Sequence, residues 1–380
     1  MGYQRKDGKY GVRNHVLVMS SVACANGVVE AIGRVFPDVV TICYSYGCGP
    51  AGEDVRVAAR TLAGIANNPN VGAVLFVGLG CEGMQSGRLA QAVKDKPVAN
   101  LVIQRDGGSA ATTAKGIDIV RRFLDGLRLQ PRVPAPLSAL VVGLECGGSD
   151  AFSGMTANPA VGNAADRFVA EGATVILSET TEMIGTTHIL KRRAATPQVA
   201  EQIEQMISQQ EQVVRDTLGE NAGMVIAPGN IEGGLSSITE KSLGCITKGG
   251  TTPINEVLKY AERPSKRGLV LMDTPGFDID SMTGFAGGGT QLILFTTGRG
   301  TPAGFPAVPV IKVVSNSTTF KAMPGDIDVN AGAVLDEGKT IEEVGSEIFE
   351  LTLKVANGLL TCAEVNRSAP FNILKQGPTF

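Results

Sequence analysis

The sequence predicts an α/β protein made of two Rossmann-like domains, each built on a mostly parallel sheet. Short apolar runs alternate with amphipathic segments along most of the chain, a pattern typical of parallel strands connected by helices. The length of 380 residues is enough for two domains of ordinary size. A segment with three prolines, residues 127–138 (LRLQPRVPAPLS), separates two such series of elements and is expected to be a linker.

The first domain is expected to span residues 1–130. Its strands are predicted at residues 15–23, 39–44, 71–79 and 99–104, where β-branched and aliphatic side chains predominate. The predicted helices are residues 27–35, 53–66, 86–93 and 112–127. This strict alternation indicates a parallel sheet that is covered on both faces.

The second domain is expected to span residues 138–380 and to repeat the same architecture. Strands are predicted at residues 139–144, 173–178, 268–272, 291–296 and 308–314, and helices at residues 160–171, 197–218 and 340–357. Ligands of open parallel sheets bind outside the carboxyl ends of the strands. We therefore expect the active site in a cleft at those ends.

Composition and charge exclude several classes of protein. A net charge of −3, an aromatic content of 5% and the absence of Trp argue against a nucleic-acid-binding surface. The chain has no apolar run long enough for a transmembrane helix, and residues 1–13 lack the apolar segment of a signal peptide. The expectation is a cytoplasmic protein without a membrane partner, whose thiols stay reduced.

Four of the seven cysteines lie just beyond the carboxyl ends of predicted strands: Cys24, Cys48, Cys81 and Cys146. Thiols that meet at this edge would favour iron, an iron–sulfur cluster or zinc. The alternative is that each thiol packs as a small apolar side chain. Spacing alone does not decide between the two, because the chain has no CxxC pair. The other cysteines, Cys43, Cys245 and Cys362, lack this position.

Polar residues also follow the predicted strands of the second domain. Residues 146–158 (CGGSDAFSGMTAN) form a loop that brings Ser149, Asp150 and Asn158 to the sheet edge. Glu179, Glu182 and His188 follow the next strand. They are interpreted either as an acid–base group or as a solvated helix face.

Basic residues are candidate ligands for a carboxylate. Arg299, in the segment TTGRGT that starts at residue 296, is flanked by glycines and suits a bidentate contact, with Thr297 beside it. Arg13 with Asn14, and Lys241 with Lys248, are further candidates, although either pair can be plain surface charge. Residues 47–52 (GCGPAG) match GxGxxG, but a lone match on a second strand is a weak indication of a dinucleotide.

Several motifs, in order along almost the whole chain, together resemble the altronate dehydratase and galactarate dehydratase family. They are residues 2–14 (GYQRKDGKYGVRN), 21–24 (SVAC), 46–49 (YGCG), 78–82 (GLGCE), 145–162 (ECGGSDAFSGMTANPAVG), 178–193 (SETTEMIGTTHILKRR) and 228–244 (PGNIEGGLSSITEKSLG). The resemblance implies an iron-dependent hydro-lyase that removes water from a sugar acid to give a 2-keto-3-deoxy acid. The iron would be a [4Fe-4S] cluster or a single Fe²⁺ ion acting as a Lewis acid.

The resemblance also implies roles for the residues at its motif positions. The preferred iron ligands are Cys48, Cys81 and Cys146, with Cys24 in reserve. His188 is the leading acid–base residue, assisted by Glu179 or Glu182. The expected substrate contacts are Arg13, Asn14, Glu82, Ser149, Asp150, Asn158, Lys241, Lys248, Thr297 and Arg299.

One departure from the family leaves alternatives open. Full-length members carry a small β-rich domain before the segment at which this chain begins. The small domain is then either a separate subunit or dispensable. A two-subunit arrangement is similar to that of sulfolactate sulfo-lyase, which eliminates sulfite in place of water. A non-catalytic sugar-acid-binding protein is the alternative from another class, and a homo-oligomer is the default assembly.

Overall fold

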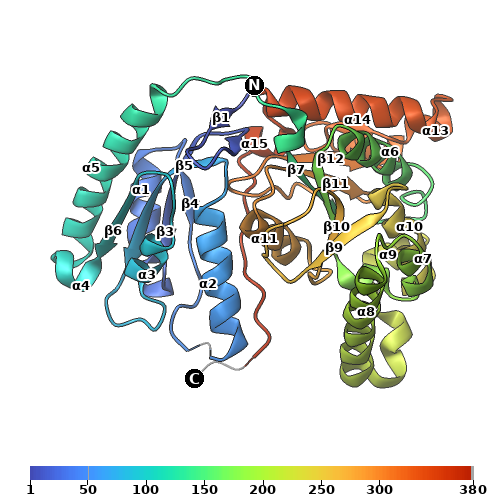
Figure 1. Ribbon diagram of the computed structural model, residues 1–380, viewed down its shortest axis with the longest axis horizontal. Coiled ribbons are helices and arrows are strands. Elements are labelled where there is room, and N and C mark those ends of the chain that lie inside the picture. The colour runs from blue at the N-terminus through green and yellow to red at the C-terminus, as the bar shows by residue number, and fades with distance from the viewer. Residues whose placement is uncertain (50, 378–380) are drawn as a thin grey trace.

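The computed structural model describes residues 1–49 and 51–377 and confirms the predicted α/β fold with two parallel sheets. The two sheets lie side by side along the long axis of the molecule, with helices on both faces of each (Figure 1). Pro50, inside the segment 47–52, lies outside the described residues. A short antiparallel hairpin, β1 (Tyr3–Gln4) and β2 (Tyr10–Gly11), precedes the first sheet.

The first sheet has four strands in the order β4-β3-β5-β6, and all its neighbouring strands are parallel. Alternate residues of β3 point to opposite faces. Val16 and Val18 pack in one cluster with α1 and α5, while Leu17 and Met19 pack in another with α2. The elements are β3 (His15–Ser20), α1 (Asn26–Val35), β4 (Val40–Ile42), α2 (Glu53–Ala66), β5 (Val71–Gly78), α3 (Ser86–Gln91), β6 (Val98–Val102), α4 (Ile103–Asp106) and α5 (Gly108–Arg128).

The second sheet has seven parallel strands in the order β13-β12-β11-β7-β8-β10-β9. Its strands are β7 (Val141–Cys146), β8 (Thr174–Leu177), β9 (Ile254–Leu258), β10 (Gly268–Met272), β11 (Leu292–Thr297), β12 (Val310–Val314) and β13 (Val329–Asn330). Its helices are α6 (Ala157–Ala170), α7 (Thr187–Arg192), α8 (Pro197–Leu218), α9 (Pro228–Glu232), α10 (Ile238–Cys245), α11 (Asp278–Gly288), α12 (Ser317–Ala322), α13 (Ala333–Asp336), α14 (Ile341–Ala356) and α15 (Cys362–Val365).

One hydrophobic cluster joins the two domains. It contains side chains of α2 from the first domain and of α11 from the second, together with residues of both sheets. The two helices approach closely because glycines face each other: a Cβ added to Gly64 would lie 2.2 Å from the carbonyl oxygen of Gly287. The chain end also crosses between the domains, where the amides of Gln376 and Gly377 donate to the carboxylate of Asp54 at 3.0 and 2.7 Å (Figure 1).

The predicted strands and helices are present, with ends that differ from the expected ones by a few residues. Capping explains the clearest boundaries: Thr196 caps α8 ahead of Pro197, and Thr340 with Glu343 forms a capping box on α14. The sequence analysis did not predict the short strands β1, β2 and β13, several short helices, or the longer elements β9 and α11. Helix α11 contains three glycines within its eleven residues, so it forms because the surrounding core buries it and not through helix propensity.

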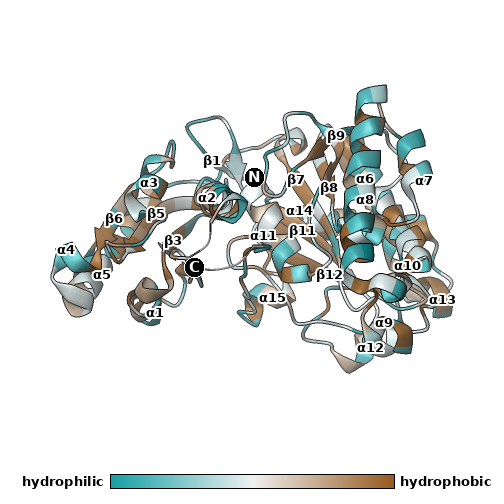
Figure 2. Cartoon of the chain, turned by 90° about the horizontal axis from the view of Figure 1, so that it is seen from below, coloured by the Kyte–Doolittle hydropathy of each residue, from teal (hydrophilic) through white to brown (hydrophobic). Residues whose placement is uncertain are grey.

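Apolar residues concentrate in the strands of both sheets, whereas the outer surface of α8 is largely polar (Figure 2). Of the helices in residues 1–49 and 51–377, none has both the length and the apolar character that crossing a membrane requires.

Candidate active site

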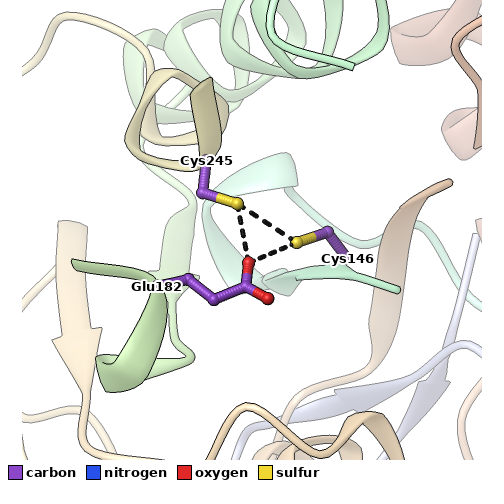
Figure 3. Close-up of side chains that lie close together, drawn as sticks. All are labelled: Cys146, Glu182 and Cys245. Atoms are coloured by element: carbon purple, nitrogen blue, oxygen red, sulfur yellow. Dashed lines mark hydrogen bonds between the residues drawn. The ribbon is translucent and has the colours of Figure 1, made fainter. Parts of the chain in front are cut away.

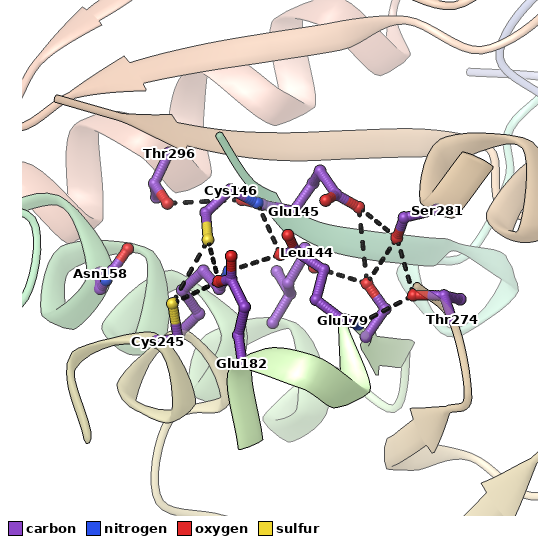
Figure 4. A network of polar contacts seen from close by, with 12 residues as sticks. Leu144, Glu145, Cys146, Asn158, Glu179, Glu182, Cys245, Thr274, Ser281 and Thr296 are labelled. Atoms are coloured by element: carbon purple, nitrogen blue, oxygen red, sulfur yellow. Dashed lines mark hydrogen bonds and ion pairs between the residues drawn. The ribbon is translucent and has the colours of Figure 1, made fainter. Parts of the chain in front are cut away.

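The carboxyl edge of the second sheet gathers a buried cluster of acidic, basic and thiol side chains. Glu145 and Cys146 end β7, while Glu179 and Glu182 lie directly after β8, where the 3-10 helix η3 (Thr180–Met183) begins (Figure 4). All four residues are at most 3% exposed. The structure thus brings the predicted Glu179 and Glu182 together with Glu145 and Cys146 at the strand ends.

Two thiols and one carboxylate form the centre of this cluster. The Sγ atoms of Cys146 and Cys245 lie 3.3 Å apart, and Oε2 of Glu182 accepts a hydrogen bond from each, at 2.7 and 2.6 Å (Figure 3). Burial, and then the neighbouring Cys245, raise the pKa of the Cys146 thiol well above its ordinary value. The sequence analysis did not single out Cys245, which lies on α10 and not after a strand; the fold brings it beside Cys146 at the end of β7.

Two lysines balance the acidic groups, Lys248, which is fully buried, and Lys241, whose side chain is 11% exposed. Lys241 contacts Oε1 of Glu182, and Nζ of Lys248 lies 3.0 Å from Oε2 of Glu179. Burial is the largest single influence on Lys241 and opposes its charged form, but the negative charges around it, Glu182 foremost, together outweigh burial and raise the pKa of this lysine. For Glu182 burial is again the largest single influence, but Lys241, Lys248 and the two thiol hydrogen bonds together exceed it, so its pKa is lowered. Lys241 and Glu182 therefore form a charged pair in the interior.

A second acidic group lies beside the first. Glu145, Glu179 and Asp278 each bring a carboxylate oxygen to the same small region. Burial, and then the charge of Glu179, raise the pKa of Glu145 well above its ordinary value, and burial raises the pKa of Asp278 to about 7. Ser281 donates to Oε2 of Glu145 at 2.6 Å. Burial and the neighbouring carboxylate thus favour the neutral form of Glu145, which is hydrogen-bonded to Ser281.

A cavity of about 260 Å³ opens beside the thiols. Within the described chain, Oγ of Ser149 and Oδ1 of Asn158 are buried and have no hydrogen-bond partner. Lys241 and Cys245 form part of the same wall. The lining residues are Ser149, Asp150, Ala151, Ser153, Gly154, Asn158, Leu235, Glu240, Lys241, Leu243, Gly244 and Cys245. An enclosed ammonium group with unpaired hydroxyl and amide oxygens suits a polar, hydroxylated anion.

A larger hollow of about 600 Å³ lies between the domains. Several basic residues line it, including Lys96 and Arg263, but no cysteine and no histidine does. Lys96 donates to three backbone carbonyls, of Ala66, Asn68 and Val71, at 2.8 to 3.0 Å. We therefore place the chemistry at the smaller cavity, where nucleophilic, acidic and basic groups meet.

Asp150 orders the loop that follows β7. Its Oδ1 accepts hydrogen bonds from Ser153 and from Oγ of Ser315, and its Oδ2 accepts one from Asn316 at 3.0 Å. The loop after β11 lies against it, since a Cβ on Gly298 would lie 2.3 Å from the Asp150 carboxyl carbon. Asp150 lines the cavity, as its predicted substrate role requires, but most of its acceptor capacity serves the loop.

The loop after β11 contributes less than expected. Thr297 is fully buried, and its Oγ1 accepts from the amide of Gly300. Arg299 pairs with Glu232 at 3.0 Å on the surface, and both side chains are about half exposed or more. Neither residue lines the cavity.

Three predicted residues lie elsewhere. Arg13 is buried against Glu364 and three backbone carbonyls, and Asn14 bonds to Arg5 and to the chain around residues 127–130. His188 borders a separate surface hollow together with Lys191 and Glu204. The structure thus assigns Arg13 and Asn14 to packing of the N-terminal segment, a correction to their predicted substrate contacts, and it does not bring His188 to the cavity.

The first domain presents its own group of thiols at the carboxyl edge of its sheet. Cys24, Cys48 and Cys81 are all exposed and follow the neighbouring strands β3, β4 and β5. The expected convergence with Cys146 is not found, because Cys146 is buried against Cys245 in the other domain.

The three loops that carry these thiols interlock. The amide of Ala23 donates to the carbonyl of Tyr46, and the amide of Met84 donates to that of Gly47. Glu82, 2% exposed, closes the group by accepting from Ser21 Oγ at 2.9 Å and from the Gly80 amide at 2.6 Å. Glu82, predicted as a substrate contact, holds the loops in place.

Comparisons with known proteins agree with this architecture. Residues 137–379 match the family model described as "D-galactarate/Altronate dehydratase, C-terminal", and residues 2–128 match "D-galactarate dehydratase/Altronate hydrolase, second domain". The chain belongs to the D-galactarate/altronate dehydratase family. The boundary between the two matched regions falls in the proline-containing segment that separates the two sheets.

Relatives of this dehydratase family resemble the chain over nearly its whole length. Altronate dehydratase of Bacillus subtilis is 35% identical over 391 residues, covering 100% of this chain and 78% of the relative. Galactarate dehydratase (L-threo-forming) of Escherichia coli is 38% identical, with 94% of this chain and 72% of the relative covered. The (2R)-sulfolactate sulfo-lyase subunit beta of Chromohalobacter salexigens is 34% identical, with coverages of 96% and 94%.

The sequence held one overlooked indication of Cys245. Lys241 and Cys245 are four residues apart on α10 and therefore lie on one helix face, with Lys248 following on the 3-10 helix η5 (Ile246–Gly249). For the acidic residues Glu145 and Asp278 no such indication exists, because only the neighbouring strands and α11 bring them together.

Proposed function

We propose that this member of the dehydratase family is a lyase that removes water from a sugar acid to give a 2-keto-3-deoxy acid. The observation that supports it most is the cavity at the end of β7, with the Lys241 ammonium and the unpaired oxygens of Ser149 and Asn158 in its lining. These groups match the carboxylate and the hydroxyls of a sugar acid.

The charge of Lys241 serves the difficult step of this elimination. Loss of the proton next to the carboxylate builds negative charge on the carboxylate oxygens. An ammonium that is buried beside the cavity and fixed by Glu182 stabilises that charge without having to reorganise. Ser149 and Asn158 would orient the hydroxyl-bearing carbons relative to it.

We infer that iron is held at the carboxyl edge of the first sheet by Cys24, Cys48 and Cys81. Three exposed thiols on interlocked loops provide soft ligands at one edge of the sheet, which suits an iron–sulfur cluster. Iron held by these residues would supply Lewis-acid chemistry. Anaerobic purification followed by iron and acid-labile sulfide determination tests this assignment, and the Cys48→Ser and Cys81→Ser variants should lose the bound iron.

The test of the function is turnover of a panel of aldonic and aldaric acids under anaerobic conditions, with the 2-keto-3-deoxy product measured. Lys241→Met should lower kcat/KM by about 100-fold or more, the usual effect of removing one preorganised charge-stabilising donor. Lys266→Met is the matched control. Lys266 is exposed and precedes the amino end of β10, whereas the cluster lies at the carboxyl ends of the strands, so this variant should keep wild-type turnover. If Lys241→Met left kcat/KM unchanged, the substrate would have to bind somewhere other than this cavity.

Elimination of sulfite is the second candidate function. The chain covers 94% of the sulfo-lyase subunit beta, against 78% and 72% of the two dehydratases described above. Release of sulfite from (2R)-sulfolactate, measured beside dehydration of the sugar acids, distinguishes the two leaving groups. A separate small subunit would then be required for full activity, and its addition is the second arm of the same assay.

A further inference from the structure

The hollow of about 600 Å³ between the two domains has no part in the proposed dehydratase reaction. Its first-domain wall comes from the end of α2 and from segments that precede β5 and β6, at the amino edge of the first sheet. The thiols of Cys24, Cys48 and Cys81 lie at the opposite, carboxyl edge. The second-domain wall contains residues 261–263 and Gly287 of α11. A ligand in this hollow therefore touches both domains and none of those thiols.

Positive charge dominates the lining of the hollow. The basic side chains are Arg5, Lys9, Arg60, Lys94, Lys96 and Arg263, and the acidic ones are only Asp7, Asp95 and Glu262. Asp7 is already paired with Lys9 at 2.5 Å. Within residues 1–49 and 51–377, none of Arg60, Lys96 and Arg263 forms a salt bridge with a carboxylate. The hollow thus has an excess of positive charge that the surrounding chain does not neutralise.

Two guanidinium groups present donors to the hollow. Nε of Arg60 donates to the carbonyl of Tyr260 at 2.9 Å, and Nη2 of Arg263 donates to the carbonyl of Asn67 at 2.8 Å. Each of these bonds crosses from one domain to the other and orients the arginine. Neither guanidinium has another hydrogen bond in the described part of the chain, so most of its five N–H donors are available. Oriented guanidinium groups suit the oxygens of a phosphate or a carboxylate.

Lys96 shows that the cations around the hollow repel one another. Its Nζ atom is anchored by three backbone carbonyls between the end of α2 and the start of β5. Burial, and then the positive charges of Arg5 and Arg263, lower the pKa of Lys96 to about 6. A negative charge beside these groups offsets their repulsion and favours the charged form of the lysine.

We propose that this hollow binds a small anion with at least two negative charges, a phosphate ester or a dicarboxylate, at a site separate from the cavity at the end of β7. A volume of about 600 Å³ lies within the range of small-molecule sites. Because Arg60 and Arg263 already join the two domains, an anion bound to both strengthens the contact between the domains. The proposal does not rest on the dehydratase reaction, because binding can be measured without turnover.

The test is isothermal titration calorimetry of the full chain with inorganic phosphate and, separately, with succinate, which distinguishes the two ligand classes. We expect one ion of at least one probe per chain, and a higher Tm in its presence. The side chain of Lys94 is exposed and has no hydrogen bond or salt bridge to the described residues, so a change there should not disturb folding. Lys94→Glu should weaken binding by at least about 10-fold, because it replaces an attractive charge with a repulsive one.

Two control variants locate the bound ion. Lys321→Glu makes the same change in net charge on α12, outside the lining of the hollow, and should bind the probe as the wild type does. Lys241→Met removes the ammonium group of the smaller cavity and should also retain binding. Loss of binding in Lys241→Met, equal weakening in Lys94→Glu and Lys321→Glu, or no saturable binding of either probe would each overturn the proposal.

Discussion

Replacing Arg13 by Met tests whether this residue holds the structure or binds substrate. Its guanidinium forms a bidentate pair with Glu364, with Nε–Oε1 at 2.7 Å and Nη2–Oε2 at 2.8 Å. It also donates to the carbonyls of Val12, Val355 and Leu359 at 3.0, 2.8 and 2.7 Å. The contact joins the N-terminal segment to the end of α14 and to α15, over 340 residues further along the chain.

The size of the effect follows from this burial. Removing one partner of a fully buried ion pair costs about 3–5 kcal/mol. The Arg13 side chain is 9% exposed and that of Glu364 is 18% exposed, so water compensates part of the loss. We expect Arg13→Met to lower the free energy of unfolding by roughly 2–4 kcal/mol, with the orphaned carbonyls accounting for part of that value.

Urea unfolding of the wild type and the variant measures this difference. The matched control is Arg121→Met, which removes an exposed pair with Asp118 on α5 and should cost less than about 0.5 kcal/mol. The KM for the sugar acid should be unchanged in Arg13→Met below its unfolding transition. Control-like stability together with a KM raised tenfold or more would refute the reasoning and restore Arg13 as a substrate ligand.

Three further predictions concern packing, pH and the surface histidine. Gly64→Ala should destabilise the protein by about 1–3 kcal/mol, because its Cβ would meet the backbone of α11. Gly126→Ala, in open space on α5, should be neutral or slightly stabilising in the same urea experiment. Burial, and then the positive charge of Arg13, lower the pKa of His15 to about 4. Unfolded chains take up this proton from about pH 6.5 downward, so stability falls as pH drops from 6.5 to 4. Between pH 7 and 5 the loss is about 1–2 kcal/mol, and His15→Gln should remove that part of the pH dependence. His188→Gln should keep kcat within about threefold, since His188 lines a different hollow, and a loss of 100-fold or more would return it to the acid–base role.

The local pattern of apolar and polar residues was sufficient to predict most of the strands and helices. The β-branched runs and helical periodicities define individual strands and helices, and these signals lie within ten to twenty residues of sequence. Strand ends in parallel sheets all point to one edge, so the positions of Cys24, Cys48, Cys81 and Cys146 at such edges followed from the strand pattern alone. The family resemblance rests on the same contiguous motifs.

The contacts between distant segments depended on the tertiary structure. Cys245 contacts Cys146, which lies 99 residues away in the sequence, and Arg13 pairs with Glu364, which lies 351 residues away. No local periodicity encodes either contact. Likewise α11 exists because both sheets bury it, in spite of its glycines. The sequence determined which side chains stand at the edges of the sheets. The order of the strands and the packing of α10 against β7 decided which of them touch, because burial, and with it every charge pairing in the site, is set by elements far apart along the chain.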